Sequence, residues 1–186
     1  MAQHMLVGLR VLLVLGGAAA LGAAALRAEP APIAPASQAF PTIRHPEKMQ
    51  DPEFARSSYI EHCAGCHGVA GSSIPANLPE LKDRVGWFMC TPGARAYLLR
   101  LPNVAHSRIT DNEALADLMN FVVFELGGSS VPAGTKPFTA AELAHERQFA
   151  LIGPVLKAER VRLSNDVIRK CHAPASLRLQ YPHSPQ

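Results

Sequence analysis

Residues 63–67 read Cys63-Ala64-Gly65-Cys66-His67, a Cys-x-x-Cys-His motif. The chain has 4 cysteines and 8 histidines among 186 residues, so chance would produce this motif only about 0.004 times. Two thiols three positions apart near a helix turn can each bond to one vinyl group of a porphyrin, while the adjacent imidazole lies under the iron. The motif therefore predicts one covalently attached haem of the c type, held by Cys63 and Cys66, with His67 as an iron ligand.

A Cys-x-x-Cys pair also occurs in thioredoxin-like redox proteins and as half of a zinc site. No alternation of strands and helices surrounds this pair, and the sequence contains no second Cys-x-x-Cys. Both observations favour the haem interpretation over its two rivals.

The sequence on either side of the motif predicts helices. Residues 51–62 are rich in helix formers and end where the motif begins, so a first helix is expected there. Thr91 is a good N-cap and Pro92 suits the first helical position, which predicts a second helix over residues 91–100. Glycines and prolines between residues 68 and 79 indicate a loop.

A third helix is expected from Thr110 to Gly127. Thr110 and Glu113 have the spacing of a capping box, and Gly127 is a typical helix terminator. Apolar residues then recur on one helical face, which predicts an amphipathic, packed helix: Leu115, Leu118, Met119, Val122 and Leu126. No pattern of alternating residues predicts a strand, so the expected fold class is all-α.

Four features around the motif occur together in one known family. They are Tyr59 in the preceding helix, CAGCHG at 63–68, a Gly- and Pro-rich loop, and a final helix that contains TDNEALADLMNFV at 110–122. In these features residues 52–127 resemble the class I c-type cytochromes. The resemblance implies a haem domain of three or more helices, haem bound covalently through the two cysteines, and His67 as the proximal ligand. It also implies a distal Met ligand in the loop before the final helix.

The sequence departs from that family at the distal ligand. Residues 101–110 contain no Met, and their one strong iron ligand is His106. The prediction is therefore coordination of the iron by His67 and His106. Met89, Met119 and an open sixth position are the alternatives. The distinction matters because Met/His ligation raises the reduction potential of a haem.

The surroundings of the haem give three further expectations. The second ring nitrogen of His67 should donate to a backbone carbonyl. The resemblance implies that this carbonyl belongs to a Pro in the loop after the motif, for which Pro75 and Pro79 are the candidates. The remaining cysteines, Cys90 and Cys171, are expected to form a disulfide in an exported chain, and two free thiols are the alternative. Four apolar residues are expected to cover the haem: Trp87, Phe88, Leu118 and Val122.

The N-terminus has the pattern of an export signal. Residues 1–28 combine an early basic residue, an apolar run and small residues suited to cleavage, which predicts a signal peptide and a periplasmic location. The apolar run over 11–26 is shorter than the roughly 20 residues that span a bilayer. Retention of residues 5–26 as an uncleaved membrane anchor is the alternative.

The rest of the chain divides into three expected segments. Residues 29–43 are rich in Pro and Ala and predict an extended linker. Residues 44–128 form the expected haem domain. Residues 129–186 form a helical extension, with capping at Thr139 and a last helix from Pro154 to Val161. That extension is expected either to pack on the haem domain or to anchor the protein in a larger complex.

Composition and charge limit the function. Apolar residues make up 48% and charged residues 18%, with a formal charge of +3, so neither a disordered chain nor a nucleic-acid partner is expected. A covered haem with both axial positions filled can only exchange electrons. The sequence therefore predicts a non-enzymatic periplasmic carrier of single electrons between redox proteins, either free or as the cytochrome subunit of a dehydrogenase. A haem enzyme or gas sensor with an open sixth position is the alternative.

Overall fold

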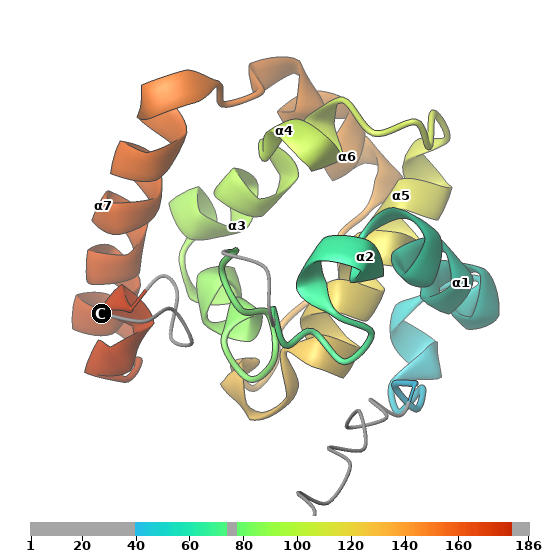
Figure 1. Cartoon of the computed structure of the whole chain (residues 1–186), viewed down its shortest axis with the longest axis horizontal. Helices are drawn as coiled ribbons and strands as arrows, with labels where there is room; N and C mark the ends of the chain where they lie inside the picture. Colours follow the sequence, from blue (N-terminus) through green and yellow to red (C-terminus); the bar gives the residue numbers. More distant parts are fainter. Residues whose placement is uncertain (1–39, 74–77, 180–186) are drawn as a thin grey trace, which may run out of the picture. The chain divides into compact units, whose positions relative to one another are not determined.

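The computed structural model describes residues 40–73 and 78–179, which belong to one compact unit spanning residues 36–186. All regular elements in the described part are helical, which confirms the expected all-α fold (Figure 1). The expected signal peptide and residues 29–39 of the expected linker lie outside the described residues. None of the described helices is both long and apolar enough to cross a membrane.

Helix α1 (Pro52–His62) leads directly into the short helix α2 (Ala64–His67), which carries most of the motif. Asp51 caps α1, because its carboxylate accepts a hydrogen bond of 2.9 Å from the backbone N–H of Phe54. Gly68 ends α2 with a φ of 72°, a backbone conformation that favours glycine. The first expected helix is thus confirmed, and the chain turns sharply after His67.

The segments around the motif include several short helices: η1 (Pro46–Lys48) precedes α1, and η2 (Val85–Cys90), α3 (Pro92–Leu99) and α4 (Pro102–Ala105) follow α2. The hydroxyl of Thr91 accepts from the backbone N–H of Ala94 at 3.3 Å. The expected N-cap and the second expected helix are therefore confirmed.

Helix α5 (Asn112–Phe121) continues through a π-helical turn, η3 (Val122–Leu126), to Gly127. The expected N-cap, Thr110, is wrong by one residue. Asp111 caps the helix instead, by accepting from the backbone N–H of Glu113 at 2.9 Å. The Glu113 carboxylate accepts from the side chain of Gln50 at 2.8 Å. Every residue of the expected apolar stripe is buried, so the third helix is otherwise confirmed.

Two buried carboxylates on this central helix hold the segment before α1. Asp117 accepts from the backbone N–H groups of Gln50 and Asp51 at distances of 2.8 to 3.0 Å. Glu125 accepts from the N–H groups of Arg44 and His45 at 2.9 and 2.7 Å. The two buried carboxylates keep their hydrogen bonds, because they accept from backbone N–H groups of the segment before α1.

The C-terminal part consists of η4 (Gly128–Ser130), α6 (Ala140–Glu146), η5 (Arg147–Phe149), α7 (Gly153–Cys171) and η6 (Ala175–Arg178). Thr139 caps α6 as expected, accepting from the N–H of Glu142 at 3.2 Å. The last long helix does not stop at Val161. It continues to Cys171, where His172 takes a left-handed conformation with a φ of 56°.

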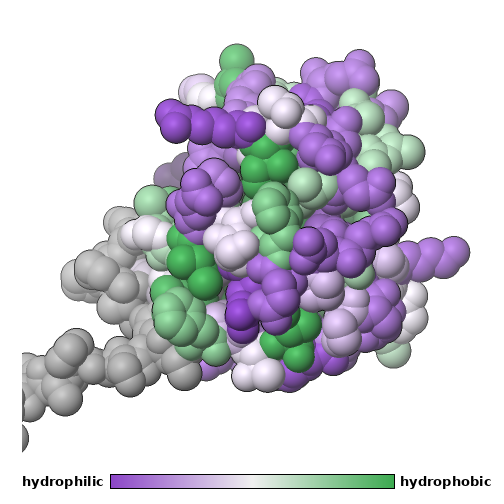
Figure 2. All heavy atoms as spheres, turned by 90° about the vertical axis from the view of Figure 1, so that its right-hand side faces the viewer, coloured by the Kyte–Doolittle hydropathy of each residue, from purple (hydrophilic) through white to green (hydrophobic). Residues whose placement is uncertain are grey.

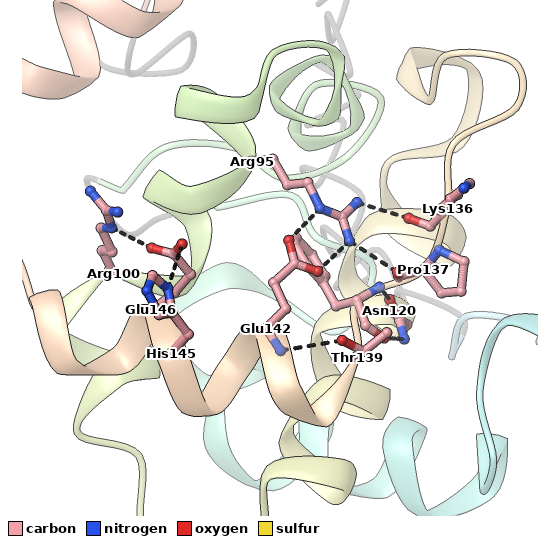
Figure 3. A network of polar contacts seen from close by, with 10 residues as sticks. Arg95, Arg100, Asn120, Lys136, Pro137, Thr139, Glu142, His145 and Glu146 are labelled. Atoms are coloured by element: carbon pink, nitrogen blue, oxygen red, sulfur yellow. Dashed lines mark hydrogen bonds and ion pairs between the residues drawn. The ribbon is translucent and has the colours of Figure 1, made fainter.

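Figure 3 shows how α3 is joined to α6. The guanidinium of Arg95 donates twice to the carboxylate of Glu142, at 2.5 and 2.6 Å, and to the carbonyls of Lys136 and Pro137 at 2.8 and 2.9 Å. Asn120 on α5 exchanges two hydrogen bonds with the backbone of Phe138. Such bidentate, partly buried pairs fix the relative position of the three helices.

Helix α7 runs along η2 and α3, on the side of the unit away from α1 (Figure 1). A disulfide joins Cys90 to Cys171, with 6.3 Å between the Cα atoms, so the expected pairing is confirmed. Leu163 and Val167 bury the inner face of the helix. The opposite, α1-side face of the unit is mostly polar, with small apolar groups between the polar residues (Figure 2).

Candidate haem-binding site

The motif lies on the wall of a cavity of about 460 Å³, a volume typical of pockets that bind organic ligands. Cys63, Cys66 and His67 all line it. Most of the other lining side chains are apolar. They come from the segment before η2, from η2, α3, α4, α5, η3 and α7, and from the end of the described chain: Leu78, Leu81, Val85, Phe88, Leu98, Leu101, Val104, Leu115, Leu118, Met119, Val122, Leu156, Leu177 and Leu179. The cavity therefore offers two thiols and an imidazole in an apolar environment.

Local hydrogen bonds place the motif. The backbone N–H of Cys63 donates to the carbonyl of Tyr59 at 2.9 Å, which continues the line of α1 into the motif. The N–H of His67 donates to the carbonyl of Cys63 at 3.0 Å. The buried hydroxyl of Tyr59 donates to the carbonyl of Gly68 at 2.5 Å and so fixes the turn that follows His67.

The ring of His67 has a defined orientation. Its Nδ1 lies 3.3 Å from the hydroxyl oxygen of Ser73, and that hydroxyl donates to the carbonyl of Pro79 at 3.2 Å. Ser73 thus links the imidazole to the Pro79 carbonyl. Since Nδ1 is engaged in this way, Nε2 is the nitrogen available to a metal. Of the two expected partners, Pro79 is thus in place, whereas Pro75 lies outside the described residues.

Burial sets the protonation of the histidine and of the first cysteine. Burial lowers the pKa of His67, the hydrogen bond to Pro79 opposes this, and the charge of Arg160 lowers it further, so the neutral ring that binds iron is favoured. Burial, with a smaller contribution from Cys66, raises the pKa of the Cys63 thiol to about 11. Cys66 is exposed, which places one edge of the cavity at the surface.

The structure does not bring His106 to the cavity. His106 caps the end of α4, is exposed, and is absent from the lining. The guanidinium of Arg147 holds this loop by donating to the carbonyls of Ala105 and Ser107 at 3.1 and 3.4 Å. The role of His106 as sixth ligand therefore stays a prediction, without support from the described arrangement.

The alternative methionines differ in position. Met119 on α5 lines the cavity, whereas Met89 in η2 is buried without lining it. Of the four residues expected to cover the haem, Phe88, Leu118 and Val122 line the cavity. Trp87 does not; it packs against the core from outside.

Sequence reasoning missed three polar residues of the cavity. Two of them lie on α7, and the third is held by hydrogen bonds to the C-terminal part. Arg160 and Ser164 reach the cavity from α7, and the Nε of Arg160 donates to the hydroxyl of Tyr97 at 2.8 Å. Arg84 also lines the cavity and donates to the carbonyls of Ser176 and Leu179 at 2.7 and 3.0 Å. Only the spacing of Arg160 and Ser164, one helical turn apart, could have placed them on one face of a helix.

Comparison with known proteins gives two relatives, both named cytochrome c-552 and both from Thermus thermophilus. Each is 27% identical to this chain over 118 residues, which covers 54% of this chain and 90% and 80% of the two relatives. No model of a known protein family matches the chain, and no solved structure gives a significant match. The chain is thus distantly similar to c-type cytochromes, a class that transfers electrons by means of haem c.

Proposed function

We propose that this protein is an exported single-haem cytochrome of the class I type that transfers single electrons between redox proteins. One observation carries the proposal: the Cys-x-x-Cys-His motif lines an apolar cavity, with the Nδ1 of His67 already engaged and Nε2 left for iron. In this proposal Cys63 and Cys66 hold the haem by thioether bonds and His67 is its proximal ligand. When bound, the haem supplies a one-electron Fe(III)/Fe(II) couple.

The mass of the mature protein tests covalent attachment. The chain should be expressed in a bacterium with cytochrome c assembly machinery, and denatured before mass spectrometry. The wild type should gain the mass of one haem, while the double variant Cys63→Ala/Cys66→Ala should carry none. The matched control is Cys90→Ala/Cys171→Ala, which removes two cysteines away from the motif and should keep the haem. A colourless wild type with the mass of the bare polypeptide would refute the proposal.

Spectroscopy of the same haem-loaded protein identifies the sixth ligand of the iron. The described arrangement supports Met119 better than His106, because only Met119 lines the cavity. A near-infrared magnetic circular dichroism band typical of Met ligation, lost in Met119→Leu, would identify Met119. Low-spin EPR signals without that band, changed to high spin in His106→Ala, would identify His106 and show that loop 105–109 turns inward.

Electron transfer would occur at the edge of the cavity near Cys66. Cys66 is exposed at the wall of the cavity, so a haem attached there would present its thioether edge to a partner. Contacts between electron-transfer partners are small and transient. The partners are therefore redox proteins, such as a dehydrogenase, an oxidase or another cytochrome, and the predicted signal peptide places the exchange in the periplasm. Cell fractionation with haem staining tests that location.

A haem enzyme or gas sensor is the competing function. It requires an open sixth position, and the polar pair of Arg160 and Tyr97 in the cavity is the observation that favours it. Carbon monoxide distinguishes the two functions. A prompt and complete Soret shift of the reduced protein would establish an open position, whereas no shift within minutes would support the electron carrier.

A further inference from the structure

Helix α7 brings a positive charge to the cavity that no described carboxylate neutralises. Arg160 lines the cavity and is half-buried, and its Nε donates to the hydroxyl of Tyr97. Among the described residues, its terminal nitrogens Nη1 and Nη2 have no hydrogen-bond partner, and no carboxylate lies within 4.0 Å of the guanidinium. A guanidinium of this kind has donors and positive charge available for a ligand.

The other arginines nearby are paired. On the same helix, Arg162 pairs with Glu159 and Asp166, and Arg169 pairs with Asp166. Across the cavity, Arg84 donates to two backbone carbonyls. Arg84, Arg162 and Arg169 thus each have a carboxylate or a carbonyl partner. Within residues 40–73 and 78–179, Arg160 lines the cavity and has neither.

Tyr97 holds the guanidinium in position. The residue is 3% exposed and its ring stacks on Phe88, with 5.7 Å between ring centroids. The phenol oxygen is thus fixed by packing on α3, and the bond from Arg160 fixes the longer and more flexible side chain against it. The Cys90–Cys171 disulfide and the buried inner face of α7 hold the helix that carries Arg160.

We propose that Arg160 and Tyr97 form a binding site for an anionic oxygen inside the haem cavity, to which the C-terminal helix α7 supplies the positive charge. The inference rests on the proposed function, because the haem provides the anion or its iron holds it. Two sources share this chemistry: a propionate carboxylate of the haem itself, which the electron carrier supplies, and a small oxyanion bound at the iron, which requires the open sixth position of the competing function. In either case a guanidinium offers paired donors that match a carboxylate.

Other charged and titratable groups also line the cavity, and the experiment must separate them from Arg160. They come from the end of α1, the motif, the segment before η2, and α3: His62, Cys63, Cys66, His67, Glu80, Arg84 and Tyr97. None of these is changed in the variants of Arg160, so a difference between those variants and wild type reports the guanidinium alone.

The test uses the haem-loaded full chain with Arg160→Gln, Arg160→Lys and the matched control Arg162→Gln, which removes a paired arginine from the solvent side of the same helix. Tyr97→Phe is the second variant, since it keeps the ring and removes the hydroxyl. Mass spectrometry first establishes haem attachment in each protein. Absence of haem from wild type would therefore count against the proposed function and is read separately.

Two measurements distinguish the sources of the anion. If a propionate is the ligand, the inflection in the pH dependence of the reduction potential should move up by about one pH unit or more in Arg160→Gln, because a nearby positive charge lowers a carboxyl pKa. If an oxyanion at the iron is the ligand, formate should bind the ferric protein about 10-fold or more weakly in Arg160→Gln, as judged by Soret titration. Arg160→Lys should restore part of the effect.

Either shift, absent from Arg162→Gln, supports the site and names its ligand. The inference is overturned if both the potential curve and the formate affinity of Arg160→Gln match those of Arg162→Gln. It is equally overturned if Arg160→Lys, Arg160→Gln and Arg162→Gln all show the same shift. The effect would then not depend on the charge at the cavity.

Discussion

Tyr59 shows at the scale of one residue how the motif is held. The side chain is fully buried between α1 and α5, with its ring 5.5 Å from that of Phe121. Its hydroxyl donates to the carbonyl of Gly68, directly after the predicted iron ligand. A single phenol thus connects the helix before the motif to the turn after it, and the position of His67 depends on that bond.

Tyr59→Phe should lower the free energy of unfolding by about 1–2 kcal/mol. The substitution keeps the ring packing but removes the hydroxyl that donates to the carbonyl of Gly68, which then accepts only from the backbone N–H of Gly71. Urea denaturation of the haem-loaded protein measures the change. Ser57→Ala is the control, because it removes a hydroxyl that donates to a carbonyl on the exposed side of α1 and should have little effect.

The same residue predicts a dependence of stability on alkaline pH. Burial, and to a smaller extent the charge of Cys63, raises the pKa of Tyr59 well above its usual value of about 10. The stabilisation is therefore complete below pH 10 and is lost as the pH rises toward the higher pKa of the folded state, because the unfolded state then binds fewer protons. The free energy of unfolding should fall with a slope of up to about 1.4 kcal/mol per pH unit above pH 10. Tyr59→Phe should have a shallower slope; an equal slope in both proteins would refute this origin.

Single residues also show where sequence reasoning is sufficient. The orientation of the His67 ring depends on contacts with the loop that directly follows the motif, where Ser73 links the ring to the carbonyl of Pro79. His106 was chosen by its place in the chain, and the loop around it is held by Arg147, far along the sequence. A local pattern carries no information about such a distant donor.

At the scale of helices, α5 and the turn that continues it organise the structure. One face buries the apolar stripe, and two residues, Asp117 and Glu125, are buried carboxylates that bind the backbone of residues 44–51. The sequence predicted the stripe, because apolar spacing of 3 and 4 residues is a local property. It did not predict the carboxylates, because acidic residues in an amphipathic helix are usually exposed.

Asp117→Ala should lower the free energy of unfolding by about 2–4 kcal/mol. The substitution leaves the N–H groups of Gln50 and Asp51 without an acceptor. Asp117→Asn keeps one acceptor oxygen and should cost less. Thermal and urea denaturation measure both. Glu61→Ala on the exposed side of α1 is the control, and an effect of Asp117→Ala no larger than that of Glu61→Ala would contradict the assigned role.

At the scale of the whole molecule, the C-terminal helix completes the cavity. Leu156, Arg160 and Ser164 reach it from α7, and the disulfide ties the end of that helix to η2. The boundary predicted at residue 128 stays a prediction. Residues on both sides of it line the same cavity, so the haem domain and the extension should be stable together.

Cys90→Ser/Cys171→Ser should lower the free energy of unfolding by up to about 4–5 kcal/mol, since the bond closes a loop with a sequence separation of 81. The haem should stay attached, because Cys63 and Cys66 are unchanged. Thermal denaturation measures the loss. Thiol titration of the denatured, unreduced wild type should find no free thiol; two free thiols would show that the bond is absent from the protein in solution.

The sequence alone determined the all-α fold, the motif with its three residues, and the starts of α1, α3 and α6. Each of these depends on residues within a few positions of one another, through capping, helical spacing and the reach of adjacent side chains. Only the tertiary structure decided that His106 lies outside the cavity, that Met119 and Arg160 line it, and that the last helix covers it. These outcomes depend on contacts between segments separated by many tens of residues, where burial and charge pairing select one arrangement among many that local sequence permits.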